Sequence, residues 1–242
     1  MFILLRSIKY DSMIDVGAYF GYFSIYLDLV QQAEVIAYEA DIDNFKQLQF
    51  FISYNNSKVK AFNNAVGDVV DEINFFKPTC QESGKFPSHG QIGDPSKDSN
   101  NLYKNLKYTK QSVKMLPLKD IIELHLKGKT LLKIDIEGYE EKALRSAQNL
   151  LKQLKDIDLI VEIMINDTNS LEVFNLLQDC GYKGYLITNA GLVAEDRPLV
   201  LPKPNADPHE NKLRTLWKNH FFTKRSSQEI KKLNLSIYKY NI

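Results

Sequence analysis

The chain has 242 residues, 44% of them hydrophobic and 25% charged, a composition that is ordinary for a globular protein with a buried core. Its 31 basic and 30 acidic residues leave a formal net charge of +1, which argues against a polyanionic partner such as nucleic acid. No apolar run approaches the ~20 residues that span a bilayer, and the two cysteines define no disulfide framework. We therefore expect one cytoplasmic α/β domain over residues 1–242, without a membrane partner and with its oligomeric state open.

From the N-terminus onward, short apolar runs alternate with longer amphipathic ones, which predicts parallel strands joined by helices. One helix is expected after Gly21, and another after Asp41, whose side chain suits an N-cap. The predicted strands of this half cover residues 13–16, 35–38, 59–65 and 72–76.

Residues 78–112 differ from the rest of the chain, because they are rich in Ser, Gly, Asn, Asp and Lys and lack hydrophobic periodicity. Loops of this length in compact domains are usually functional or disordered. We expect a long inserted surface loop here, a candidate lid over a site.

Regular patterning resumes after this segment. The predicted strands of the second half cover residues 113–116, 130–136, 159–165, 182–188 and 192–194. Helices are expected at 118–126, at 140–154, and from Asp167 or Thr168 to near Gly181. The last two strands could form a hairpin through residues 189–191, and the extension at about 202–242 is assigned no element.

The segment from Asp15 to Gly21 joins the first predicted strand to the first helix. Gly17 permits a tight turn, and the helix start offers free N–H groups to an anionic ligand. A dinucleotide site requires G-x-G-x-x-G, whereas Ala18 and Tyr19 stand here between the two glycines. Their side chains would crowd a pyrophosphate, and S-adenosylmethionine has none. The turn therefore favours that donor, with a purely conformational role of the glycines as the alternative.

Glu39 ends the second predicted strand. An acid at this position can accept hydrogen bonds from both hydroxyls of a ribose. The competing interpretation is a solvated acid at the start of a helix.

Four segments of the chain resemble motifs of the FkbM family of methyltransferases. They are DVGAYFGYFS at 15–24, YEAD at 38–41, NNAVGD at 63–68 and LLKIDIEGYEEKAL at 131–144, in the order of the family, with VEI at 161–163 similar to its next strand. The resemblance implies a Rossmann-like class I methyltransferase fold. Such a fold has a mostly parallel seven-stranded sheet, helices on both faces and a C-terminal antiparallel strand. The resemblance also implies S-adenosylmethionine as donor and O-methylation of a sugar or natural product.

Carried over by position, the resemblance implies a donor-binding set and an active centre. The donor-binding residues are Asp15, Gly17, Ala18, Gly21, Glu39, Ala40, Asn64, Ala65, Asp68 and Asp135. Ala40 stands where the family usually has proline. Asp135 and Glu137 would face the active centre, and the acceptor would be a small molecule or glycan.

Transfer of a methyl group to a hydroxyl requires alignment of the reactants and a base for the released proton. Asp135 and Glu137 would project from the same face of an extended strand, with Glu162 on a neighbouring strand. His89, in the inserted segment, is a third candidate base. The three carboxylates could instead hold Mg²⁺ together with Asn166, but we assign them acid–base work and no metal.

Lys133 interrupts an otherwise apolar strand and would need a partner if it is buried. We expect it to pair with Glu162 or to emerge at a sheet edge, in a structural role.

Three other functions remain open from the sequence. One is a nucleic-acid methyltransferase: the N/D-P-P-F/Y loop common in base methylation is absent, but this absence does not exclude methylation of an RNA ribose. A nicotinamide-dependent oxidoreductase would share the strand, the turn and Glu39, although the middle glycine of its fingerprint is missing. A non-catalytic binding protein could also retain the fold. The acceptor itself cannot be identified from these residues.

Overall fold

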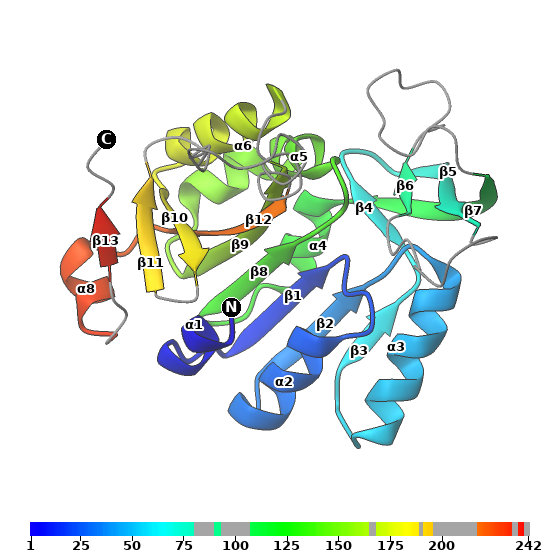
Figure 1. Cartoon of the computed structure of the whole chain (residues 1–242), viewed down its shortest axis with the longest axis horizontal. Coiled ribbons are helices and arrows are strands. Elements are labelled where there is room, and N and C mark those ends of the chain that lie inside the picture. The colour runs from blue at the N-terminus through cyan, green and yellow to red at the C-terminus, as the bar shows by residue number, and fades with distance from the viewer. Residues whose placement is uncertain are drawn as a thin grey trace, which may run out of the picture.

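A nine-stranded sheet of order β13-β11-β10-β12-β9-β8-β1-β2-β3 forms the centre of the structure (Figure 1). The computed structural model describes residues 1–79, 90–92, 107–164, 168–188, 191–195, 217–233 and 237–239. The strands of this sheet are β1 (Ser12–Val16), β2 (Glu34–Tyr38), β3 (Lys60–Phe62), β8 (Thr130–Ile134), β9 (Ile157–Met164), β10 (Lys183–Thr188), β11 (Gly191–Glu195), β12 (Trp217–Thr223) and β13 (Ile237–Lys239).

The five strands from β3 to β9 run parallel, and β12 is antiparallel to both of its neighbours, β9 and β10. All residues of β1 and β8 are buried, as expected for strands covered on both faces. The chain leaves β1 for β2 on one side and returns to β8 on the other, so β1 and β8 flank the topological switch point. Ligands of such sheets bind at the carboxyl ends of the strands near this point.

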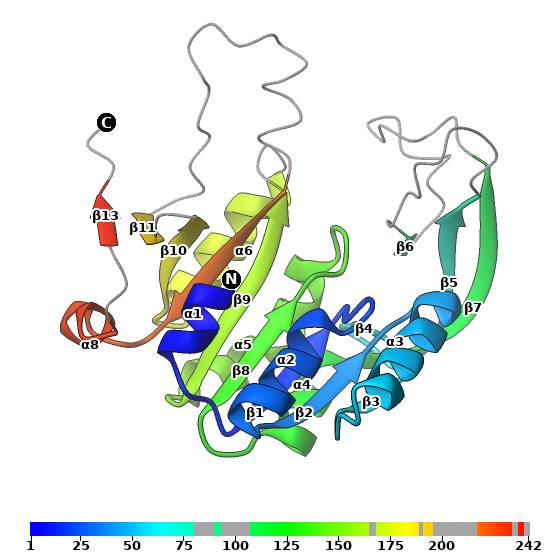
Figure 2. The ribbon, with the colours of Figure 1, turned by 60° about the horizontal axis from the view of Figure 1, so that its bottom comes forward.

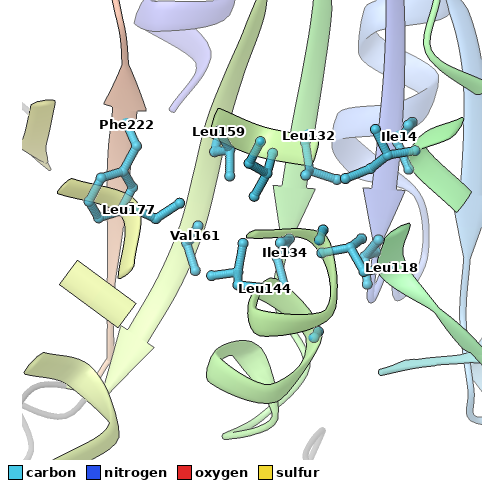
Figure 3. Close-up of a cluster of buried hydrophobic side chains, with 14 of the residues drawn as sticks. Ile14, Leu118, Leu132, Ile134, Leu144, Leu159, Val161, Leu177 and Phe222 are labelled. Carbon is cyan, nitrogen blue, oxygen red and sulfur yellow. The ribbon is translucent and has the colours of Figure 1, made fainter. Parts of the chain in front are cut away.

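Helices cover both faces of the sheet (Figure 2). Their bounds are α1 (Phe2–Ser7), α2 (Tyr22–Gln31), α3 (Ile42–Tyr54), α4 (Leu118–His125), α5 (Glu140–Gln153), α6 (Thr168–Asp179) and α8 (Ser227–Lys231). The apolar residues of α4, α5 and α6 pack on one face of the sheet. Figure 3 shows Leu118 on the side of Ile14, Leu144 beside Ile134, and Leu177 beside Phe222. Those of α1, α2, α3 and α8 pack on the opposite face. Among the residues described above, no helix combines the length and apolar character needed to cross a membrane.

A second, four-stranded sheet stands beside α3 with order β4-β7-β5-β6 (Figure 1). Its strands are β4 (Ala65–Gly67), β5 (Asp71–Pro78), β6 (Gln91–Ile92) and β7 (Tyr108–Pro117). The expected strand at 59–65 is therefore wrong in extent, because the chain passes from β3 in one sheet to β4 in the other. The prediction of a loop over 78–112 is also wrong for the residues that form β6 and the first part of β7. Most side chains at the start of β7 are partly or fully exposed, so this strand lacks the apolar signature of a buried one.

The α/β class, the parallel order and the antiparallel C-terminal strand agree with the predicted fold, but the main sheet has nine strands instead of seven. The additions are β11, which pairs antiparallel with β10, and β13, which pairs with β11. The C-terminal extension supplies β12 to the interior of the sheet, where Asn219 and Phe221 pair with strand β9.

A buried polar cluster attaches this returning strand at the end of the sheet opposite to the switch point. Asp158 accepts hydrogen bonds from Tyr10 Oη at 3.1 Å, Thr223 Oγ1 at 2.6 Å and Arg225 Nη2 at 2.7 Å. The Asp158 carboxylate is buried and requires these partners, because an unpaired charge in the interior is strongly unfavourable. The cluster therefore joins the N-terminal segment, β9 and β12.

Substituting Arg225→Met should lower the free energy of unfolding by about 3 kcal/mol, because it leaves Asp158 buried without its cation. Denaturant unfolding monitored by circular dichroism measures the loss. The control is Arg145→Met, which removes an exposed partner of Glu141 and should change stability by less than about 1 kcal/mol. Equal losses in both variants would contradict the assignment of Asp158 as a buried anchor.

Candidate active site

A cavity of about 250 Å³ lies where β1, β2, β8 and β9 end, and residues of the second sheet contribute to its wall. Eight of the predicted site residues line it: Gly17, Ala18, Glu39, Ala40, Asn64, Ala65, Asp135 and Glu137. The cavity lies at the switch point, so the topology and the sequence motifs indicate the same place.

The turn after β1 is left-handed at Gly17, Tyr19 and Gly21, with φ angles of 75°, 52° and 81°. A Cβ atom at Gly17 would lie 1.8 Å from the carbonyl oxygen of Asp135, so only glycine allows this contact between the two backbones. Gly21 has another role, because its missing side chain makes room for Leu48 on α3. The two glycines therefore hold the turn against β8 and α3.

Glu39 lies directly beneath this turn and is only 7% exposed. Its carboxylate accepts hydrogen bonds from the backbone N–H groups of Tyr19 at 2.8 Å and Asp41 at 2.9 Å. Burial raises the pKa of Glu39 to about 7, while these hydrogen bonds act in the opposite direction. Asn63, which the sequence analysis did not single out, fixes the same segment by donating to the carbonyls of Glu39 and Ala40.

The carboxylates of Asp135, Glu137 and Glu162 converge, with one oxygen of each within 4.8 Å of the others. The prediction that Asp135 and Glu137 project from the same face of an extended strand is wrong, because β8 ends at Ile134 and the chain does not continue as an extended strand. Instead, Glu137 adopts a left-handed conformation with φ of 55°, which turns the chain before α5. The three acids meet through this turn and through the neighbouring strand β9.

Glu140 stabilises that turn. Its buried carboxylate accepts hydrogen bonds from the backbone N–H groups of Ile136 at 3.0 Å and Gly138 at 3.0 Å. Burial raises the pKa of Glu140 to about 7, against the effect of these donors. Its position as the first residue of α5 is the sequence signal that could have identified it.

Comparison with known proteins gives a family. A family model described as "Methyltransferase FkbM domain" matches residues 15–183, which is more than half of the chain. The chain belongs to the FkbM methyltransferase family. A search of curated protein sequences gives no significant match.

Several solved structures are similar to this FkbM methyltransferase at low sequence identity. An rRNA methylase from Streptococcus thermophilus has a TM-score of 0.50 at 9% identity, with 93% of each chain covered. SMU.1697c from Streptococcus mutans, solved in complex with SAH, has a TM-score of 0.48 at 9% identity, covering 91% of this chain and 92% of that one. Precorrin-6y C5,15-methyltransferase from Geobacter metallireducens has a TM-score of 0.46 at 10% identity, covering 92% and 85%.

In this FkbM methyltransferase, Lys133 lies in the middle of the main sheet, so the expectation of a sheet-edge lysine is wrong. Its ammonium group is 3.4 Å from Asp15 Oδ1 and 3.2 Å from Asp135 Oδ2. It does not pair directly with Glu162 as expected, because Asp15 is its cross-strand neighbour on β1. Burial alone would lower the pKa of Lys133, but the charges of Asp15 and Asp135 outweigh burial and raise the pKa above its ordinary value.

Glu162 is the most strongly perturbed acid of the cavity. Its pKa is raised to about 9, and burial is the largest cause. The charge of Asp135, a hydrogen bond with Asp135 and the charge of Glu137 act in the same direction. Glu162 therefore carries a proton near neutral pH, and its acid group can donate that hydrogen bond to the Asp135 carboxylate.

The second sheet forms one wall of the cavity, which the sequence did not predict. The cavity is lined by Phe75 of β5, by Gly90 just before β6 and by Ile92 of β6. Two side chains attach this sheet to the segment after Glu39, because Gln111 donates to the carbonyl of Ala40 at 2.6 Å and Lys77 pairs with Asp41 at 2.9 Å. The wall is therefore fixed to the same backbone that positions Glu39.

Of the four remaining predicted residues, Asp15, Gly21 and Asp68 are absent from the cavity lining, and Gly21 instead makes room for Leu48 as described above. Asp15 is buried behind the turn, where it accepts a hydrogen bond from Ser24 at 2.6 Å. Asp68 accepts a hydrogen bond from the Tyr139 hydroxyl at 3.1 Å outside the cavity lining. His89, like Asn166, lies outside the described residues.

The raised pKa of Glu162 predicts the pH dependence of stability. Because the folded protein binds this proton more tightly than the unfolded chain, folding takes up a proton between the ordinary glutamate pKa and about 9. Stability should therefore fall as pH rises through this window, with Glu39 and Glu140 contributing in the same direction below about 7. Thermal melts from about pH 5 to about pH 9 should show a smaller decline for Glu162→Gln than for the native protein. An unchanged slope would contradict a buried, protonated Glu162.

Proposed function

We propose that this chain transfers a methyl group from S-adenosylmethionine to a hydroxyl group of a sugar, a glycan or a small natural product. The observation that carries the proposal is the meeting of the Gly17 turn, Glu39 and Asp135 at one cavity at the switch point of the sheet. Membership of the FkbM methyltransferase family supports the donor and the reaction type.

The residues around the cavity fit an adenosyl sulfonium. Gly17 and Ala18 stand before the N-terminus of α2, whose free N–H groups and positive dipole end suit the carboxylate of the donor. Glu39 presents a buried carboxylate that lines the cavity and suits the ribose hydroxyls. Ala40, Asn64 and Ala65 form the adjoining wall on the side proposed for adenine. When bound, the donor supplies an already activated methyl group, so the protein mainly has to align the reactants.

Asp135 is the proposed proton acceptor for the acceptor hydroxyl. It follows β8 directly, lines the cavity, and is partly exposed there, as a group that receives a proton from a substrate must be. Glu137 is the second candidate, and Glu162 with its own proton is suited to donating a hydrogen bond to Asp135. The proposed role of His89 remains a prediction.

A non-catalytic binding protein and a nicotinamide-dependent enzyme are the competing functions. Thermal-shift assays with S-adenosylhomocysteine and NAD distinguish a methyltransferase from a nicotinamide-dependent enzyme, since a ligand stabilises the fold that binds it. Incubation with labelled donor and a panel of sugars, glycan fragments and natural-product alcohols tests catalysis. Donor binding without transfer to any acceptor would favour the non-catalytic function.

Asp135→Asn should retain binding of S-adenosylhomocysteine but lower kcat by about 10²- to 10⁴-fold, because the amide cannot accept the hydroxyl proton. Calorimetry measures the first property and labelled-methyl transfer the second. Native turnover in this variant would remove Asp135 from the proposed mechanism and direct attention to Glu137.

Glu39→Gln should weaken binding of S-adenosylhomocysteine by about tenfold or more, since a charged acceptor of ribose hydrogen bonds is lost. The matched control is Glu34→Gln at the opposite end of β2, where the side chain pairs with Lys60 and Lys127 away from the cavity. Calorimetry should show native affinity for the control. Equal affinities in both variants would argue against the ribose assignment.

Mg²⁺ bound by Asp135, Glu137 and Glu162 is the alternative to acid–base work by these groups. We assign no metal, because the ammonium of Lys133 already lies 3.2 Å from Asp135 and would repel a second cation. Methyl transfer by the purified protein should therefore persist after dialysis against EDTA. Loss of activity that added Mg²⁺ restores would overturn this assignment.

A further inference from the structure

Lys133 makes three contacts that cross the centre of the proposed site. Its ammonium group lies 3.4 Å from Asp15 Oδ1 on β1 and 3.2 Å from Asp135 Oδ2 after β8, and it donates to the carbonyl oxygen of Gly17 at 3.2 Å. The contacts with Gly17 and Asp135 are hydrogen bonds, whereas the contact with Asp15 is an ion pair whose Oδ1 atom accepts no hydrogen bond. The side chain is 3% exposed, which keeps water from competing for the same contacts.

The two ends that Lys133 joins have different proposed tasks. Gly17 belongs to the turn that holds the donor, whereas Asp135 is the group that receives the proton of the acceptor. The two residues also touch directly, since a Cβ atom at Gly17 would overlap the carbonyl oxygen of Asp135 at 1.8 Å. The backbone contact sets their separation, and Lys133 fixes the direction of the Asp135 carboxylate relative to the turn.

We propose that Lys133 is a positioning residue that fixes the Asp135 carboxylate to the donor-binding turn through its simultaneous contacts with Asp135, Asp15 and Gly17. This inference rests on the proposed function, because it assigns a donor to the turn and a proton to Asp135. Methyl transfer requires an in-line arrangement, and a displacement of about 1 Å can lower the rate by about 100-fold. The side chain itself does not exchange protons with the substrate.

A purely structural role would be to neutralise Asp15, which is 1% exposed and is the cross-strand neighbour of Lys133. Removal of Lys133 alone would leave this carboxylate buried without its cation and could unfold the protein. The test therefore compares Asp15→Asn with the double variant Asp15→Asn/Lys133→Met. Both lack the buried Asp15 charge, and only the first retains the ammonium group.

The ratios of kcat and of donor-product affinity between these two variants measure the contribution of Lys133. We expect both to fold, as checked by thermal melting, and the double variant to have about 100-fold lower kcat with a smaller change in acceptor KM. Its affinity for S-adenosylhomocysteine, measured by calorimetry, should be about tenfold lower, because the carbonyl of Gly17 loses its anchor. Equal kcat and equal affinity in both variants would overturn the proposal and leave Lys133 as a structural partner of Asp15.

A second substitution keeps the proposal testable if the double variant does not fold. Lys133→Arg retains the charge on a larger planar group, so we expect near-native melting and affinity but about tenfold lower kcat. Native kcat in this variant would overturn the proposal. The lysine control is Lys224→Met, because Lys224 donates to the carbonyls of Leu151 and Leu154 far from the cavity, and its removal should leave transfer unchanged.

The outcome for Lys133 can be separated from the outcome for the proposed function. If the native protein binds S-adenosylhomocysteine but methylates no acceptor, the proposed function fails. The affinity ratio between Asp15→Asn and Asp15→Asn/Lys133→Met then still decides whether Lys133 positions the turn.

Discussion

The contact between the backbones of Gly17 and Asp135 is the constraint on which the site depends. It joins the turn after β1 to the end of β8, and it exists only because residue 17 has no side chain and can adopt a positive φ angle. Parallel pairing of β1 with β8 brings these two ends to the same edge of the sheet. The turn at Gly17 and the acidic residues therefore belong to one unit formed by adjacent strands.

The ionisable groups around this contact are of two kinds, an ion-paired lysine and buried acids. Lys133 lies between two carboxylates beneath the turn, whereas Glu39, Glu140 and Glu162 have raised pKa values because burial disfavours their ionised forms. Ionisation of these buried acids at higher pH reduces stability, so the fold tolerates an unfavourable contribution to its free energy of folding at this edge of the sheet. Perturbed acids that gather at a cavity are typical of functional sites, although structural networks such as that of Glu140 perturb pKa values as well.

The second sheet forms part of the wall of the cavity. It is attached to the backbone after Glu39 through Gln111 and Lys77, and it presents Phe75 and Ile92 to the cavity. The family model covers the second sheet and strands β2, β3, β8 and β9 of the main sheet, whereas β11, β12 and β13 lie beyond the matched residues.

The sequence by itself determined the α/β class, the alternation of strands and helices, the turn at Gly17 and Gly21, the N-cap at Asp41 and the FkbM resemblance. These features are encoded locally, in the spacing of apolar residues and in short motifs. Only the tertiary structure decided the partners of Lys133, the stabilising role of Glu140, the place of β12 inside the sheet and the wall formed by the second sheet. Each of these depends on contacts between residues distant in the chain, or on side chains whose patterns are not distinctive. Lys133 illustrates the physical reason: an isolated lysine in an apolar strand requires buried acceptors, but the pairing of β8 with β1 determines which acceptors they are.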